Sequence, residues 1–343
     1  MRDRPGKLIG TGGGGELALL DRIRKLANRP GNGGIRLGIG DDCALLRLKP
    51  GEELAVTTDL SIAGRHFRLE WHPSEAVGHR TLARGLSDIA AMGARPLAAF
   101  LSLGLPRTLT VAHGRRPAWV DGFFTGLLAL ADAHHTPLAG GDLAESQVAA
   151  ADIVLIGAVP RGQALLRSGA RPGDRIFVTG TLGGSAAGLA RLRKGKRAVS
   201  RDSVFNAKAP DPLARHVWPQ PRIAQGLWLR RHRVATAAID LSDGLSTDLD
   251  HLCAESSVSA VIDAVALPID PGATLEQALN GGEDYELLFT ARPNAVIPRR
   301  IAGVAVTPIG AVVPRRGGKP RVVLIDQSGL RRPMPPRGWQ HFS

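Results

Sequence analysis

Seven aspartates in this chain come at or near the end of an apolar run, several of them in turns that also contain glycine. They are Asp41, Asp42, Asp59, Asp88, Asp142, Asp240 and Asp243. Because this placement recurs where strands give way to turns, we expect the carboxylates to converge in space. A converged group of like charges needs cations to stay ionised, and Mg²⁺ suits such oxygens, together with substrate phosphates. The pattern therefore predicts a Mg²⁺–nucleotide site assembled from distant parts of the chain.

The size and composition of the chain fit a globular protein of about two domains. Its 343 residues are 43% apolar, enough to bury a substantial core. The two cysteines, Cys43 and Cys253, lack metal-site or redox spacing, which excludes a disulfide framework and favours a reducing compartment. Residues 1–15 hold no apolar signal-peptide core, and no run of roughly 18 apolar residues occurs in the sequence. We therefore expect a cytoplasmic protein without a transmembrane helix.

The formal net charge of +13 raises the question of a nucleic-acid partner. The basic residues are scattered, however, and only residues 191–201 and 315–321 form local runs, which we expect to be exposed loops. One tyrosine and eight phenylalanines leave no interleaving of aromatic and basic residues of the kind that stacks bases. We therefore expect no nucleic-acid partner and attribute part of the charge to anionic substrates.

Segments with helical and strand-like patterns alternate along the chain and fall into two halves. Helices are expected over residues 16–26, 73–92, 118–133, 184–193, 223–231 and 245–255. Strands are expected over residues 54–58, 97–103, 153–159, 175–179, 236–240, 259–263 and 286–290. Segments with proline and glycine at 160–162 and 170–174 indicate a boundary. The pattern predicts an α/β (α+β) chain with a disordered Gly-rich head at 1–14 and two domains, 15–160 and 161–343.

The acidic positions of the first half differ in how strongly they indicate a metal ligand. Asp41 and Asp42 lie in a Gly-rich turn, and an ordinary Asp-rich turn explains them better when they are taken alone. Thr57 and Asp59 share one face of a predicted strand and can reach one cation, although a strand-end cap is an equal alternative. Asp88 lies near the C-terminus of a predicted helix, where the helix dipole disfavours an anion. Asp88 is therefore the clearest candidate for a cation ligand.

The second half contributes three candidate motifs. Asp240 and Ser242 share a face at a predicted strand end, whereas Asp243, at the start of a predicted helix, can be a plain N-cap. Residues 179–185 join a strand to a helix through glycines and are a candidate phosphate-binding loop, although they lack the Gly-Lys-Ser/Thr of a Walker A loop. Residues 281–286 concentrate acids around the only tyrosine, either as a site or as a solvated acidic loop.

Nine sequence blocks, taken together, match a known family. They are GIGDDCALL (38–46), TTDL (57–60), HF (66–67), LSDIAAMGARP (86–96), GGD (140–142), RSGARPGDRIFVTGTLGGSAAGL (167–189), IDLSDGLSTDLDHL (239–252), GGEDYELLFT (281–290) and GWQHF (338–342). From about residue 16 to residue 342 the chain resembles the thiamine-phosphate kinase family. The resemblance implies a two-domain fold of the aminoimidazole-ribonucleotide-synthetase type, with mixed sheets flanked by helices. It also implies a homodimer paired through its N-terminal sheets.

The same resemblance implies an activity and a set of site residues. The activity is the phosphorylation of thiamine phosphate by ATP to thiamine diphosphate, the last step of that cofactor's synthesis, with several Mg²⁺ ions. Because the acceptor phosphate is already ionised, we expect direct in-line transfer without a general base. The implied Mg²⁺ ligands are Asp42, Thr57, Thr58, Asp59, Asp88, Asp142, Asp240 and Asp243; the implied ATP contacts are Gly141, Asp142, Arg167 and Ser242; and the implied thiamine phosphate contacts are His66, Glu283 and Trp339.

Two alternatives remain open. One is a related ATP-using enzyme, such as selenophosphate synthetase or the purine-pathway synthetase, which shares the GDD-like and DxSDG-like motifs. Selenophosphate synthetase normally needs a reactive Cys or selenocysteine in an N-terminal Gly-rich loop, and the head of this chain has no Cys. The other is a nucleotide- or thiamine-binding protein without catalysis, which the large set of costly carboxylates disfavours.

Overall fold

The computed structural model of the chain describes residues 16–27, 35–39, 43–112, 114, 117–195 and 212–339. The head at 1–14, for which we expect disorder, and the aspartates Asp41 and Asp42 lie outside these residues. The described helices are α1 (Glu16–Ala27), α2 (Ser74–Ala91), α3 (Trp119–Ala133), α4 (Gly184–Arg193), α6 (Pro212–Val217), α7 (Ile223–His232), α8 (Leu245–Glu255) and α9 (Leu275–Asn280). Among them, none combines the length and the apolar character that a membrane crossing requires.

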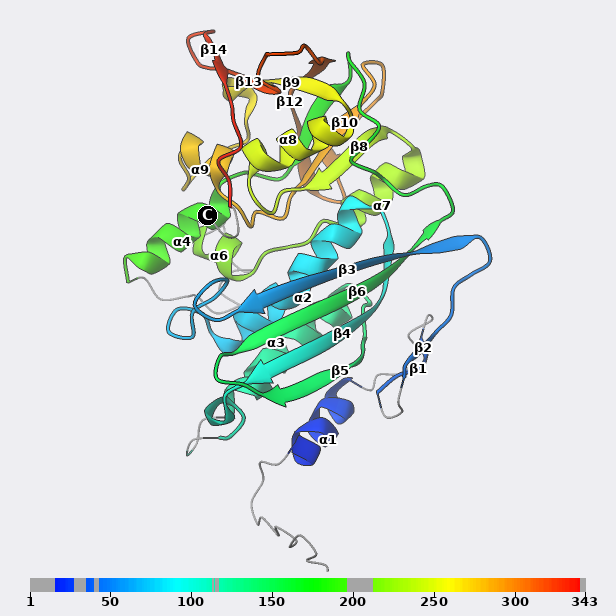
Figure 1. The fold of residues 1–343 in the computed structure, drawn as a ribbon, viewed down its shortest axis with the longest axis vertical. Helices are drawn as coiled ribbons and strands as arrows, with labels where there is room; N and C mark the ends of the chain where they lie inside the picture. The colour runs from blue at the N-terminus through cyan, green and yellow to red at the C-terminus, as the bar shows by residue number, and fades with distance from the viewer. Residues whose placement is uncertain are drawn as a thin grey trace, which may run out of the picture.

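A four-stranded mixed sheet forms the first half of the molecule (Figure 1). Its strands are β3 (Glu52–Ile62), β4 (Arg95–Leu105), β5 (Leu138–Glu145) and β6 (Ala150–Pro160). Their order across the sheet is β3-β6-β4-β5, with β4 and β5 parallel and the other pairs antiparallel. A small hairpin of β1 (Ile35–Leu37) and β2 (Leu45–Leu46) lies beside this half. The edges of the sheet are therefore β3 and β5.

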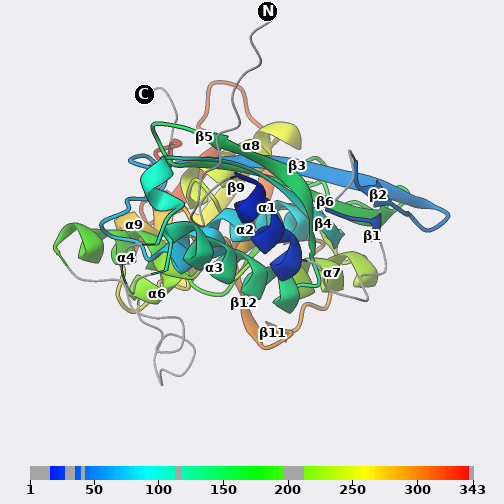
Figure 2. The ribbon, with the colours of Figure 1, turned by 90° about the horizontal axis from the view of Figure 1, so that it is seen from below.

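Helices α2 and α3 cover one face of this sheet, as Figure 2 shows from below. Leu82, Leu86 and Ile89 recur at helical spacing along α2 and are completely buried, each contributing about 1.5–3 kcal/mol. The two helices cross at very short range, because a Cβ on Gly78 of α2 would lie 1.8 Å from the carbonyl oxygen of Phe123 in α3. This tight packing fixes the position of α2, the helix that carries Asp88.

An eight-stranded sheet forms the second half. Its strands are β7 (Arg175–Thr179), β8 (Ala235–Asp240), β9 (Val258–Asp263), β10 (Leu287–Ala291), β11 (Arg300–Ile301), β12 (Val304–Pro314), β13 (Val322–Ile325) and β14 (Arg331–Pro333). The order is β14-β13-β9-β12-β7-β10-β8, with β11 paired to β12. Alternate residues serve two cores: Ile176 and Val178 pack with α8, whereas Phe177 packs in the core that α2 and α7 share. Helix α2 therefore lies between the two sheets.

The predicted α/β fold with two mixed sheets and flanking helices is confirmed. All strands of the first sheet end by Pro160, and all strands of the second begin at Arg175 or later. The bounds of α4, α8 and β7 match the prediction residue for residue. Other details of the prediction are wrong: β3 does not end at residue 58 but runs on to Ile62, and the GGD segment lies inside β5 rather than in a turn. The predicted loop at 191–201 begins inside α4, and its residues after 195 lie outside the described part of the chain.

Candidate active site

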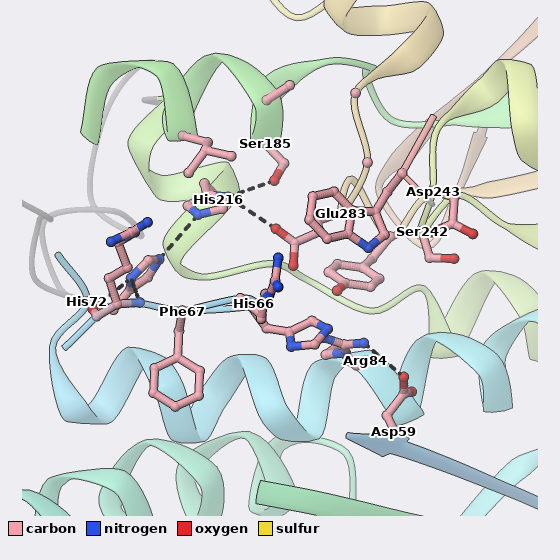
Figure 3. A pocket seen from close by; sticks show the side chains of 18 of the residues that line it. Asp59, His66, Phe67, His72, Arg84, Ser185, His216, Ser242, Asp243 and Glu283 are labelled. Atoms are coloured by element: carbon pink, nitrogen blue, oxygen red, sulfur yellow. Dashed lines mark hydrogen bonds and ion pairs between the residues drawn. The ribbon is translucent and has the colours of Figure 1, made fainter. Parts of the chain in front are cut away.

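A cleft of about 540 Å³ opens between the two halves of the molecule. Its walls come from β3 and the loop after it, from α2 and α4, and from the segments that follow β8 and α9. Residues that the sequence implicates line this cleft, drawn from both halves: Asp59, His66, Asp88, Asp240, Ser242, Asp243, Glu283 and Trp339. Side chains more than 250 residues apart in the chain thus share one cavity, and most of them are visible in Figure 3.

Three carboxylates at one end of the cleft repel one another. Asp59 comes from β3, Asp88 from the last turns of α2 and Asp240 from the end of β8. Burial raises the pKa of Asp59, and burial together with the charge of Asp59 raises the pKa of Asp88 to about 6. Burial and the charge of Asp88 raise the pKa of Asp240 to about 7. These groups therefore lack enough positive charge around them.

Short hydrogen bonds hold two of these acids in place. Thr57 Oγ1 donates to Asp88 Oδ2 at 2.5 Å, and Ser87 Oγ donates to Asp240 Oδ2 at 2.7 Å. The expectation that Thr57 and Asp59 share a face of the strand is therefore right, because both point toward α2. Asp59 Oδ1 accepts from Arg84 Nη2 at 3.1 Å.

The donor chemistry of this cluster fits Mg²⁺. Among the described residues, no three His, Cys, Asp or Glu side chains are already grouped closely enough to form a complete metal site. Mg²⁺ does not require such a cage, because it takes one or two carboxylates and completes its shell with water and substrate phosphates. Mutually repelling carboxylates with raised pKa values are the arrangement that a divalent cation would stabilise.

Asp243 is not the N-cap of the helix that follows it. Helix α8 begins at Leu245, and its N-cap is Gly244. The Asp248 Oδ2 atom accepts hydrogen bonds from the backbone N–H groups of Asp243 and Gly244, at 3.1 and 3.0 Å. The plain N-cap alternative for Asp243 is therefore wrong, and its position on the cleft needs another explanation. Its carbonyl oxygen accepts from the backbone N–H of Trp339 at 3.0 Å, which ties the C-terminal segment to the cleft.

Glu283 also lines the cleft, but unlike the three acids it has positively charged neighbours. Its backbone has a φ of 65°, a left-handed conformation that is rare for a side chain other than glycine. Arg80 Nη2 lies 2.6 Å from Glu283 Oε1, and Arg80 also donates to the carbonyl oxygen of His216. Burial raises the pKa of Glu283, but the charge and hydrogen bond of Arg80, together with the charges of His216 and Arg84, outweigh burial and lower that pKa to about 2. Glu283 is therefore anionic at all physiological pH values.

Two buried histidines lie next to Glu283: His216 is beside the carboxylate, and His72 packs against His216 (Figure 3). His216 Nδ1 lies 3.6 Å from Glu283 Oε2 and 3.0 Å from Ser185 Oγ. The Nε2 atoms of His72 and His216 are 3.2 Å apart, so one ring donates its N–H to the other. Burial and the charge of Arg80 lower the pKa of His72 to about 4 and that of His216 well below its usual value. Burial disfavours the charged form of both rings, and Arg80 provides the largest favourable charge beside Glu283.

Five described residues implicated by the sequence do not line the cleft. One is Thr57, which is joined to the lining through its hydrogen bond to Asp88. Thr58 points to the other face of the sheet, where its Oγ1 donates to Asp152 Oδ1 at 2.8 Å. Gly141 and Asp142 lie on β5, at the edge opposite β3. Three strand spacings separate Asp142 from β3, roughly 14 Å. Arg167 also lies outside the lining, yet its charge lowers the pKa values of Asp88 and Asp240, so it is close to the acids.

The glycine-rich segment at 179–185 does not present an open phosphate-binding loop. The Asp284 carboxylate accepts hydrogen bonds from the backbone N–H groups of Gly183 and Ser185, at 2.6 and 3.0 Å. A protein carboxylate thus already occupies the N-terminus of α4. The prediction for this segment is wrong because it considered the loop without the acidic segment 281–286 that packs on it. Only Ser185 in this segment contributes to the cleft.

Arg84, a cation that lines the cleft, was assigned no role from the sequence. Arg84 and Asp88 are four residues apart, which places them on one face of α2. That spacing was a usable signal for Arg84. His72 and His216 had no comparable signal, because they approach each other only through the tertiary fold.

Comparison with known proteins agrees with this architecture. Residues 40–172 match the AIR synthase related protein, N-terminal domain, and residues 171–323 match the corresponding C-terminal domain. The chain is 44% identical to the thiamine-monophosphate kinase of Escherichia coli strain K12 over 265 residues, covering 75% of this chain and 76% of the relative.

Two solved structures extend the match over the fold. The thiamine-monophosphate kinase of Stenotrophomonas maltophilia K279a superposes with a TM-score of 0.74 at 37% identity, covering 90% of this chain and 96% of that one. The complex of AaThiL with AMPPCP and TMP superposes with a TM-score of 0.72 at 32% identity, covering 96% and 97%. With identity at this level over most of its length, the chain belongs to the thiamine-monophosphate kinase family.

Proposed function

We propose that this chain transfers the γ-phosphoryl group of ATP to thiamine monophosphate, giving ADP and thiamine diphosphate. The observation that carries the proposal is the single cleft in which acids from both halves lie beside Glu283, His66 and Trp339. The names of the relatives support the reaction, and the AaThiL complex with AMPPCP and TMP supports the pair of substrates.

Within this proposal, the acidic end of the cleft holds Mg²⁺. Asp59, Asp88 and Asp240 would be its ligands, with Thr57 and Asp243 beside them. When bound, Mg²⁺ neutralises the negative charge of the two phosphate groups that must approach each other. Asp42, Thr58 and Asp142 remain proposed ligands from the family resemblance, and the number of ions is part of the same proposal.

The remaining residues bind and orient the two substrates. Glu283, His66 and Trp339 would hold thiamine monophosphate, since a fixed carboxylate and an indole face both attract a cationic thiazolium ring. Ser242 and Arg167, with Gly141 and Asp142, would contact ATP. The acceptor is an ionised phosphate, so transfer needs no general base and depends on in-line positioning and charge neutralisation.

We also propose that the protein is a homodimer paired through its N-terminal sheets. The face of β3 that α2 does not cover exposes Leu54, Val56 and Leu60, whose side chains are 50%, 61% and 49% accessible. If a second copy packs on this exposed face, its edge strand β5 can lie beside the edge strand β3 of the first copy. Such an arrangement would explain why Asp142 is remote from the other acids within one chain.

The division into domains at 15–160 and 161–343 and the cytoplasmic location remain proposals as well. The separation of the two sheets along the chain supports the division. Expression of residues 15–160 alone tests it, since an independent domain should unfold cooperatively.

The test of the function is ADP release measured with and without thiamine monophosphate. We expect release to depend on thiamine monophosphate and on Mg²⁺, with thiamine diphosphate formed in equal amount. Selenide and formylglycinamidine ribonucleotide serve as alternative acceptors, and faster ADP release with either one would replace the proposal by a related enzyme. Binding of both ligands without ADP release would indicate a binding protein. Asp240→Asn should cut turnover by about 100-fold or more, and near-normal turnover at saturating Mg²⁺ would remove Asp240 from the ligand set.

A further inference from the structure

Arg84 is a positively charged side chain that lines the cleft among its acidic residues. It projects from α2 into the lining, and its Nη2 atom is 3.1 Å from Asp59 Oδ1. Figure 3 shows its guanidinium beside His66, between Asp59 and the side of the cleft that carries Glu283. Arg80, one turn earlier, does not line this cleft, because it is committed to Glu283 and to the His216 carbonyl oxygen.

The charges around Arg84 come from three elements. The carboxylates of Asp59 on β3, Asp88 on α2 and Glu283 after α9 all interact with it electrostatically. Despite burial, these groups raise the pKa of Arg84 above its usual value, so it is charged under all working conditions. Arg84 therefore stands at the border between the acids proposed to bind Mg²⁺ and the acid proposed to bind thiamine monophosphate.

The Arg84–Asp59 pair is weak evidence for a purely structural role. The two side chains are 16% and 23% exposed, and in such a largely buried ion pair the cost of desolvation offsets much of the attraction. A guanidinium in a cleft that receives phosphates has a clearer role, because its planar fork of five N–H donors matches a phosphate in two-point contact.

We propose that Arg84 competes with Mg²⁺ for Asp59 and, once displaced from Asp59, binds the phosphate of thiamine monophosphate. The inference rests on the proposed function and names a further catalytic residue for it. Both parts of the role follow from charge. A divalent cation on Asp59 weakens the ion pair, and the guanidinium released from Asp59 can then turn to the phosphate that enters the cleft. Metal binding and substrate binding are thereby coupled through one side chain.

If Arg84 has both functions, a single substitution should strengthen Mg²⁺ binding and lower kcat/KM for thiamine monophosphate. Arg84→Gln removes the competitor, so nucleotide-free protein should bind Mg²⁺ about tenfold tighter by isothermal titration calorimetry. The same variant loses the phosphate contact, so its kcat/KM for thiamine monophosphate should fall about 100-fold. A structural role would weaken both properties together. Unchanged or weaker Mg²⁺ affinity refutes the competition, and unchanged kcat/KM refutes the phosphate contact.

Arg95→Gln is the matched control. Arg95 Nη2 lies 3.1 Å from Glu52 Oε1, the same separation as in the Arg84–Asp59 pair, and it also links another element to β3, namely β4 on the far side of β6. It does not line the cleft, so neither Mg²⁺ affinity nor kcat/KM should change by more than about twofold. A response of this variant equal to that of Arg84→Gln would refute the assignment to Arg84.

Arg84→Lys covers the case in which Arg84→Gln does not fold. It keeps the charge and loses the fork, so Mg²⁺ affinity should stay within about twofold while kcat/KM falls about tenfold. Full kcat/KM in this variant would overturn the two-point phosphate contact. Failure of the proposed function can be told apart from failure of the Arg84 proposal. If the proposed function is wrong, the wild-type protein releases no ADP with thiamine monophosphate. The calorimetric comparison still decides whether Arg84 competes with Mg²⁺ for Asp59.

Discussion

Replacing Arg80 with methionine tests the electrostatics on which Glu283 depends. The two side chains are 5% and 26% exposed, and the atoms Arg80 Nη2 and Glu283 Oε1 are 2.6 Å apart. Methionine fills much of the same volume but leaves a largely buried carboxylate without its counter-charge. Removing one partner of such a pair costs about 3–5 kcal/mol of the free energy of unfolding.

The shift in the pKa of Glu283 gives the size of the same change in the free energy of unfolding in a second way. It falls from an ordinary value of 4.5 to about 2, and one pKa unit is worth about 1.4 kcal/mol. The surroundings of the ionised carboxylate, in which Arg80 makes the largest favourable contribution, thus stabilise the fold by about 3 kcal/mol. Because the folded-state pKa is depressed, this stabilisation is present above pH 4.5 and is lost as the pH falls toward 2. At pH 3 roughly 1.4 kcal/mol of it remains, so the cost of Arg80→Met should be clearly larger at pH 7 than at pH 3.

Urea unfolding of wild type and Arg80→Met at both pH values measures this difference. The double variant Arg80→Met/Glu283→Gln is the matched control, because a neutral amide needs no counter-charge and should recover at least about half of the loss. A penalty below about 1 kcal/mol at pH 7, or one of the same size at pH 3, would refute the reasoning. In either case the histidine pair, and not Arg80, would have to support Glu283.

Three further predictions follow from the described geometry. Asp88→Asn should lose the thermal stabilisation by Mg²⁺, whereas Glu283→Gln should keep it and lose the response to thiamine monophosphate; the reverse pattern in thermal-shift titrations would contradict the division of the cleft. Val56→Glu should convert the proposed dimer to a monomer in light scattering, and Val265→Glu, at a site 70% exposed in the other half, should not; two unchanged dimers would exclude the β3 face. Gly141→Ala should cost about 2–3 kcal/mol, because its Cβ would lie 1.9 Å from the Leu101 carbonyl oxygen, whereas Gly317→Ala has open space; equal urea midpoints would be the contrary result.

The strongly periodic segments of the fold could be predicted from the sequence, and the segments with internal glycine or proline could not. Helix α8 has both a clear apolar stripe and a glycine before it, and its bounds are recovered. Strand β12 reads as broken because Pro308 and Gly310 interrupt it. The structure accommodates both residues at an irregularity in the pairing with β7. Strand β5 likewise contains Gly140 and Gly141 and resembles a turn in the sequence.

The residues of the candidate site also fall into those that could be predicted from the sequence and those that could not. Asp59, Asp88 and Asp240 share features visible in a single chain: an acid on a strand face or a helix C-terminus with apolar neighbours. The partners of Glu283 have no such mark, because Arg80 is 203 residues away in sequence and His72 meets His216 across 144 residues. Only the fold reveals that these groups neutralise and fix Glu283.

The opposed environments within one cleft explain how the chain can assign different roles to the same kind of side chain. Burial without enough positive charge raises the pKa values of Asp88 and Asp240 to about 6 and about 7, whereas Arg80 lowers that of Glu283 to about 2. Carboxylates of the first kind gain most from a divalent metal ion, whereas Glu283, whose charge Arg80 partly offsets, gains less from one and stays ionised beside the thiazolium ring. Metal ions are thereby directed to the acidic end, and Glu283 stays available for the substrate.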